Sequence, residues 1–120
     1  LAGYMRILTP LFVSHYFGKI LNIHPSLLPK FPGLNTHQKA IDASEKIHGV
    51  SVHFVTDKLD GGPIISQESV CIEVKDTAKK LSDKVLKKEH IIFPKVIHWY
   101  TQRRLKLINN TSATLDGKII

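Results

Sequence analysis

The stretch 21–29 (LNIHPSLLP) constrains the fold of this chain more than any other. The largely apolar run 19–23 is typical of a short buried strand, and the prolines that follow prevent the strand from continuing. Residues two apart on a strand share one face, so Asn22 and His24 should present an amide and an imidazole together where the strand becomes a loop.

A donating amide and an imidazole that carries a proton near neutral pH suit a reaction that builds an oxyanion on a carbonyl group. Taken alone, Asn-x-His is more often a hydrogen-bonded core histidine beside a capping asparagine. The stretch 57–63 (DKLDGGP) favours a site, because it places the acid Asp60 at another strand-to-loop junction, where it could orient the imidazole of His24.

At 120 residues, 42% hydrophobic and 22% charged, the chain is expected to form a single domain, residues 1–120. The lone Cys71 excludes an internal disulfide and a cysteine zinc cluster. Seven histidines show no metal-ligand spacing, so no metal is predicted. No apolar run approaches the length of a membrane span and no signal peptide is visible, which indicates a cytoplasmic protein.

The formal charge of +7 comes from 17 Lys and Arg residues against 10 acids, and these basic residues are scattered along the chain. We interpret them as solvated faces. Attraction of anionic substrates is the functional alternative, and nucleic acid is a weaker one because no aromatic residues interleave with the charge.

Periodicity predicts strands that alternate with helices and then an antiparallel extension, that is, an α/β sheet of mixed direction with sites at the carboxyl ends of its strands. His53, on the expected strand 49–56, could line the site or face solvent. The expected elements are a helix 10–16, a strand 19–23, a helix 36–44, paired strands 49–56 and 63–72, and a helix 77–103 kinked at Pro94. The stretch 105–120 should form a small terminal hairpin or an added edge.

The chain opens with Leu1-Ala2-Gly3 and no methionine, like the tail of a buried strand cut within the element. We therefore expect that an N-terminal part is missing.

Three stretches, 1–8 (LAGYMRIL), 22–29 (NIHPSLLP) and 49–63 (GVSVHFVTDKLDGGP), resemble the folate-dependent formyltransferases, and within them the C-terminal part of the phosphoribosylglycinamide branch. The resemblance implies a Rossmann-like α/β fold with a mixed, mostly parallel sheet flanked by helices. It also implies that the N-terminal nucleotide-binding half, with its phosphate loop, is absent.

The resemblance further implies transfer of a formyl group from the co-substrate 10-formyltetrahydrofolate to the amine of glycinamide ribonucleotide. Asn22, His24 and Asp60 would be catalytic, and Glu89 would hold the ribose hydroxyls of the nucleotide. Folate-binding positions would be Met5, Arg6, Ile7, Leu8, Val13, Thr56, Asp57, Lys58 and Leu59.

The partners implied are small molecules only, without nucleic acid, membrane or metal, and the full-length protein would be a monomer or homodimer. Two alternatives stay open: a formyltetrahydrofolate deformylase, and a truncated folate-binding module without catalysis.

Overall fold

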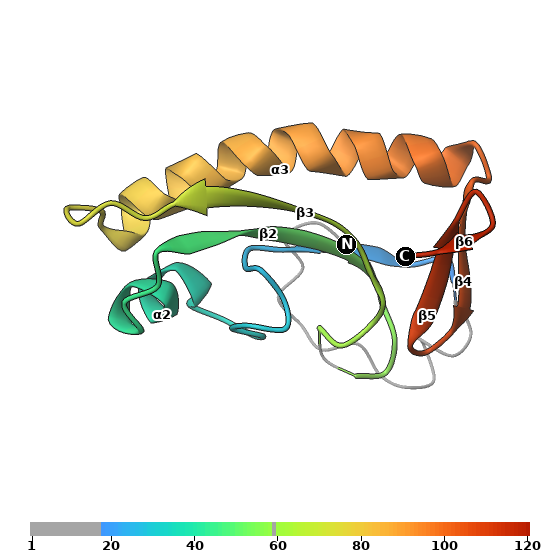
Figure 1. Ribbon diagram of the computed structural model, residues 1–120, viewed down its shortest axis with the longest axis horizontal. Coiled ribbons are helices and arrows are strands. Elements are labelled where there is room, and N and C mark those ends of the chain that lie inside the picture. Colours follow the sequence, from blue (N-terminus) through green and yellow to red (C-terminus); the bar gives the residue numbers. More distant parts are fainter. Residues whose placement is uncertain (1–17, 59) are drawn as a thin grey trace.

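The computed structural model describes residues 18–58 and 60–120, in which two antiparallel sheets and two helices are packed together (Figure 1). The expected helix 10–16 lies outside the described residues. The elements are β1 (Leu21–His24), α2 (Thr36–Asp42), β2 (Ile47–Phe54), β3 (Ile64–Cys71), α3 (Ala78–Thr101), β4 (Leu105–Asn109), β5 (Ser112–Leu115) and β6 (Lys118–Ile119).

The first sheet has the strand order β1-β2-β3, and both of its pairings are antiparallel. The predicted antiparallel pairing of the two long strands is confirmed. The expectation of a mostly parallel sheet is not confirmed by the described residues, because every described pairing, in both sheets, is antiparallel. Antiparallel neighbours need only short connections, and nine residues suffice between β2 and β3.

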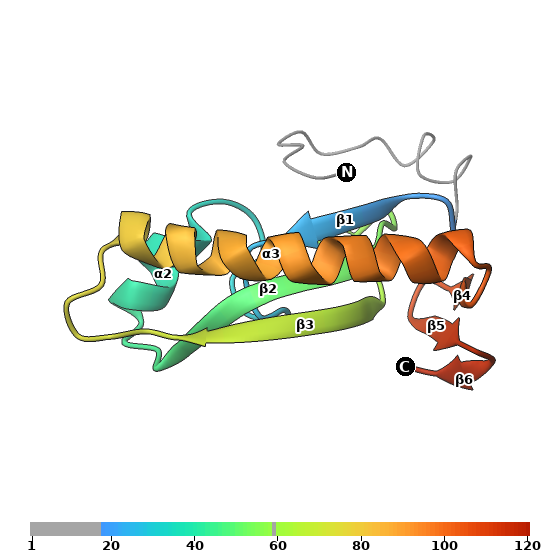
Figure 2. The same cartoon turned by 90° about the horizontal axis from the view of Figure 1, so that it is seen from above.

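Helix α3 covers one face of this sheet (Figures 1 and 2). Its first turn is capped by Thr77, whose hydroxyl accepts a hydrogen bond from the backbone N–H of Lys80. The helix runs from Ala78 to Thr101 with Pro94 inside it. Its buried side chains follow helical spacing and pack on alternate residues of β2; they are Leu81, Val85, Ile92 and Val96 against Val50, Val52 and Phe54.

The second sheet, β4-β5-β6, is a small meander that confirms the predicted terminal hairpin and adds a third strand to it. Leu105 and Ala113 join its inner face to the main core. Arg104 donates two hydrogen bonds of 2.8 Å to the carboxylate of Asp116 and so ties the start of β4 to the turn after β5.

Candidate active site

The face of the first sheet that points away from α3 carries the polar residues of β1 and β2. Opposite partners in an antiparallel pair share a face, and the register places Asn22 beside His53 and His24 beside Ser51. His24, Ser51 and His53 are buried, at 5%, 0% and 2% exposure. The sequence left the orientation of His53 open, and the structure places it on the site face.

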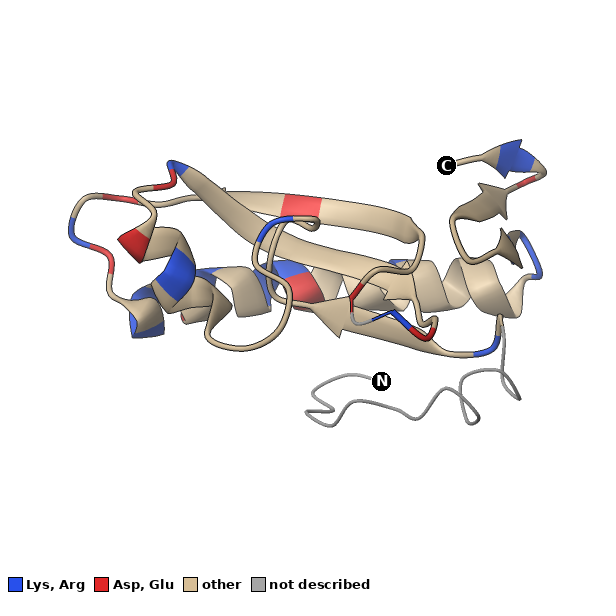
Figure 3. Cartoon of the chain, turned by 90° about the horizontal axis from the view of Figure 1, so that it is seen from below, with Lys and Arg blue, Asp and Glu red and all other residues tan. Residues whose placement is uncertain are grey.

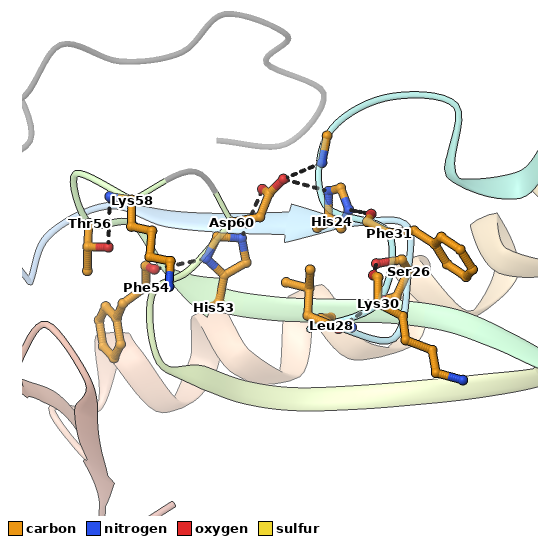
Figure 4. Close-up of polar contacts among 12 residues, drawn as sticks. His24, Ser26, Leu28, Lys30, Phe31, His53, Phe54, Thr56, Lys58 and Asp60 are labelled. Atoms are coloured by element: carbon orange, nitrogen blue, oxygen red, sulfur yellow. Dashed lines mark hydrogen bonds and ion pairs between the residues drawn. The ribbon is translucent and has the colours of Figure 1, made fainter. Parts of the chain in front are cut away.

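Asp60 lies between the two histidines (Figure 4). Its Oδ2 is 3.6 Å from Nδ1 of His24, and its Oδ1 is 3.6 Å from Nε2 of His53. The Asp60 side chain is 7% exposed. The loop after β2 therefore returns a buried carboxylate to two imidazoles, one from each neighbouring strand.

Each imidazole is held by a main-chain carbonyl on its other nitrogen. His24 Nε2 lies 2.8 Å from the carbonyl oxygen of Phe31, and His53 Nδ1 lies 2.9 Å from that of Phe54. A carbonyl oxygen only accepts, so both of these nitrogens carry protons. The remaining nitrogen of each ring faces Asp60.

Several contacts act on the proton affinity of Asp60. Burial alone would raise its pKa, but the nearby His53, the backbone N–H of Gly33 at 2.8 Å and the charge of His24 together lower the pKa below its usual value. Asp60 also has φ 48°, a left-handed conformation that Asp adopts more readily than most residues. The site therefore holds an ionised carboxylate against its burial.

Asn22 lies two residues before His24 on β1 and opposite His53 on β2. Its side chain is partly exposed, and within the described part of the chain its amide makes no hydrogen bond. The register places this amide on the sheet face that carries His24 and His53.

Ser51 of β2 makes hydrogen bonds to the loop between β1 and α2, the loop that carries Phe31 and Gly33. The Ser51 hydroxyl donates to the carbonyl of Ser26 at 2.7 Å and accepts from the N–H of Leu28 at 3.1 Å. The amide of Gln67 on β3 bonds both this hydroxyl and the carbonyl of Leu28, each at 2.9 Å. One buried hydroxyl thereby fixes the proline-rich loop on β2 and β3.

Replacing Ser51 by Ala should lower the free energy of unfolding by about 2–3 kcal/mol, because the buried N–H of Leu28 loses its partner. Urea denaturation measures this change. Ser69→Ala, at an exposed position of β3, is the control and should change the free energy by less than about 0.5 kcal/mol. Equal effects of the two substitutions would contradict the anchoring role.

A second pair of histidines, His37 and His48, lies behind the loop, with His37 Nδ1 3.1 Å from His48 Nε2. Burial, followed by the charges of His37 and His24, lowers the pKa of His48 to about 4. Burial and His24 also lower the pKa of His37. Two nitrogens this close share one proton, so the pair resists protonation.

This pair predicts a pH dependence of stability. Because the folded pKa of His48 is below the ordinary 6.5, the unfolded chain binds more protons between these values, and stability falls as the pH is lowered from 6.5 towards 4. We expect the pair to account for a loss of roughly 2–3 kcal/mol across this window. Urea denaturation at both ends of the window should show a clearly smaller loss for His48→Gln, whereas His98→Gln, at an exposed position of α3, should behave as the parent. A pH dependence unchanged by His48→Gln would contradict this assignment.

The remaining predicted positions, for folate and nucleotide binding, differ in burial and location. The loop 55–63 between β2 and β3, which contains Asp60, is called the acid loop. Thr56 near its start is buried, 5% exposed, whereas Asp57 and Lys58 are exposed. Met5, Arg6, Ile7, Leu8, Val13 and Leu59 lie outside the described residues. Within the described residues, Glu89 has no contact with the Asn22–His24–Asp60 group. It lies on α3, where burial raises its pKa.

The described strands of the first sheet carry one charged residue, Glu68. Figure 3 shows the Lys and Arg residues on the helices, the loops and the terminal strands rather than in one patch. In residues 18–58 and 60–120, no three His, Cys, Asp or Glu side chains are arranged to hold a metal ion. In the same residues, neither helix is both long and apolar enough to cross a bilayer.

Sequence reasoning missed the carbonyls of Phe31 and Phe54, the N–H of Gly33 and the role of Ser51. Main-chain groups leave no residue-type signal. The alternation along 49–56 did place Ser51 and His53 on one face, which was the available indication for both.

Comparison with known proteins gives relatives over nearly the whole chain. The phosphoribosylglycinamide formyltransferase of Escherichia coli K12 is 54% identical over 118 residues, which are 98% of this chain and 55% of the relative. The solved structure of the enzyme of that name from Coxiella burnetii is 52% identical with a TM-score of 0.91, over 98% of this chain and 55% of that one. A formyltetrahydrofolate deformylase structure from Pseudomonas syringae is 28% identical with a TM-score of 0.85, over 93% of this chain and 37% of that one.

The chain thus spans about half the length of the curated relatives it matches. The sequence profile of the family described as formyl transferase matches residues 1–97. The resemblance stated from the sequence is confirmed, and the chain belongs to the formyl transferase family.

Proposed function

We propose that this chain carries the catalytic part of a phosphoribosylglycinamide formyltransferase, which transfers the formyl group of 10-formyltetrahydrofolate to the amine of glycinamide ribonucleotide in purine synthesis. The observation that carries the proposal is the grouping of Asn22, His24 and Asp60 on one sheet face, in a chain 54% identical to an enzyme of that name. A cytoplasmic location stays a prediction.

In the proposed reaction the amine nitrogen forms a bond to the formyl carbon, and the carbonyl electron pair moves to the formyl oxygen. The amide of Asn22 and an N–H of His24 stabilise this developing oxyanion. The 3.6 Å contact between His24 Nδ1 and Asp60 is longer than a hydrogen bond, so Asp60 leaves this N–H incompletely paired, and an oxygen that enters beside the carboxylate can accept from it.

Asp60 has two roles in this scheme. Its charge favours the imidazolium form of His24, and it accepts the proton that the amine loses, directly or through water. The tetrahedral intermediate collapses when the bond from carbon to the folate nitrogen breaks and that nitrogen takes up a proton. The site therefore returns to its starting protonation state without a covalent enzyme intermediate.

Folate would bind at Thr56, Asp57, Lys58 and Leu59 of the acid loop and through the backbone near Arg6. Its apolar wall would be Met5, Ile7, Leu8 and Val13. Glu89 would bind the ribose of the nucleotide from α3. Support for these two assignments is limited to the family resemblance. The partners proposed are small molecules, and the state of the full-length protein is monomer or homodimer.

The test is a chimera of the E. coli relative in which this chain replaces the aligned 118 residues. Formyl transfer is followed with 10-formyltetrahydrofolate in the presence and absence of glycinamide ribonucleotide. Turnover that requires the nucleotide supports the proposal. A folded chimera without such turnover contradicts it.

The likeness to a formyltetrahydrofolate deformylase favours one second candidate, hydrolysis of the same formyl group. Formate release that does not depend on the nucleotide would favour this candidate. Folate binding without either turnover would favour a binding module without catalysis.

A further inference from the structure

His53 holds an unusual position in the site. Its Nε2 is the one buried side-chain nitrogen or oxygen among the described residues that lacks a hydrogen-bond partner. The side chain is 3% exposed, so water cannot satisfy this nitrogen from bulk solvent. An unpaired buried polar atom lowers the stability of the fold, so its presence in the site needs an explanation.

The geometry restricts what can lie between His53 and Asp60. Their facing atoms are 3.6 Å apart, whereas a bridging water would need roughly 4.5–5.5 Å to make a hydrogen bond to each. The pair therefore meets directly. Since Nδ1 of His53 already carries a proton towards the Phe54 carbonyl, a neutral ring would aim a nitrogen lone pair at the carboxylate.

We propose that His53 is a positioning residue that is protonated on both ring nitrogens while Asp60 is ionised, and that it orients this carboxylate for His24. This inference rests on the proposed function. One carboxylate oxygen faces His53, and the other faces both His24 and the N–H of Gly33.

The elements around His53 present few charged or titratable groups to it. Strand β1 presents His24, and the acid loop presents Asp60 together with the exposed Asp57 and Lys58. On β3 the partner of His53 is the apolar Ile64. Asp60 is thus the one buried counter-charge for both imidazoles within the described residues.

The expected consequence for the reaction is a fixed order of proton movements. The Asp60 carboxylate stays ionised and oriented by His53 until the attacking amine releases its proton. That proton passes to Asp60, and one proton is returned as the folate nitrogen leaves, so His53 itself gains and loses none.

Carboxylate NMR on the ligand-free 120-residue chain, with carbon-13 in its aspartates, tests this without any activity. His53→Phe should raise the titration midpoint of Asp60 by about one pH unit or more, a tenfold weaker acid, because a nearby positive charge is lost. His53→Gln keeps a donor without the charge and should give a smaller rise. His98→Phe, at an exposed position of α3, is the control and should leave the midpoint within about 0.2 pH units.

Nitrogen-15 NMR of the unmodified chain gives an independent result if either His53 variant does not fold. Where Asp60 is ionised, Nε2 of His53 should show the chemical shift of a protonated ring nitrogen. An unprotonated Nε2 beside an ionised Asp60, or an Asp60 midpoint that does not change in a folded His53→Phe chain, would overturn the proposal.

Kinetics in the chimera then separate this inference from the proposed function. His53→Phe should lower kcat about tenfold or more with KM within about twofold, since positioning acts on the transition state. If the chimera is inactive but the NMR results hold, the proposed function fails and the pairing of His53 with Asp60 stands.

Discussion

Replacing Asp60 by Asn should lower the kcat of formyl transfer by about 10²–10⁴-fold, with KM changed little. The amide can still accept a hydrogen bond from Gly33, but it carries no charge for His24 or His53 and takes no proton from the amine. The lost interaction develops in the transition state, so it appears in kcat. Steady-state kinetics of the E. coli chimera measure it.

Asp83→Asn is the matched control, since it makes the same chemical change at an exposed position of α3, away from the site face of the sheet. We expect its kcat within about twofold of the parent. If Asp60→Asn instead raised KM and kept kcat, Asp60 would be a substrate-binding residue and the catalytic assignment would be wrong.

The local elements of the fold could be predicted from the sequence because their signals are local. The Thr77 cap, the apolar spacing of α3 and the alternation along β2 each depend on neighbours within a few residues. The short helix α2 ends at Asp42, two residues before the predicted end, and β2 begins at Ile47 instead of Gly49. Element ends depend on tertiary contacts and are less determined by sequence.

The sheet direction and the second histidine depend on contacts between distant residues. The antiparallel register brings His53 beside Asn22, and the register shift between Val52 and His53 lies where β2 leads into the acid loop. Periodicity specifies a face but not a partner strand. For that reason Asn22, His24 and Asp60 could be predicted as a group, whereas the shared position of Asp60 between two imidazoles required coordinates.

Gly62 closes the acid loop onto the end of β2. A Cβ on Gly62 would overlap the carbonyl oxygen of Phe54, which is backbone and cannot move away as a flexible side chain could. The same carbonyl accepts from Nδ1 of His53, and the Phe54 N–H donates to Pro63 at 3.1 Å. Gly62 therefore permits the close approach that brings Asp60 to the histidines.

Gly62→Ala should accordingly lower the free energy of unfolding by about 2–4 kcal/mol, because the added methyl group forces the two backbone segments apart. Gly61→Ala is the control at the adjacent position: its Cβ would meet only the side chain of the exposed Lys58, which can move, so a loss below about 1 kcal/mol is expected. Urea denaturation compares the two. In the chimera, Gly62→Ala should also lower kcat, since displacement of the Phe54 carbonyl releases His53 and through it Asp60. Equal stability and equal kcat for the two variants would show that the acid loop does not depend on this contact.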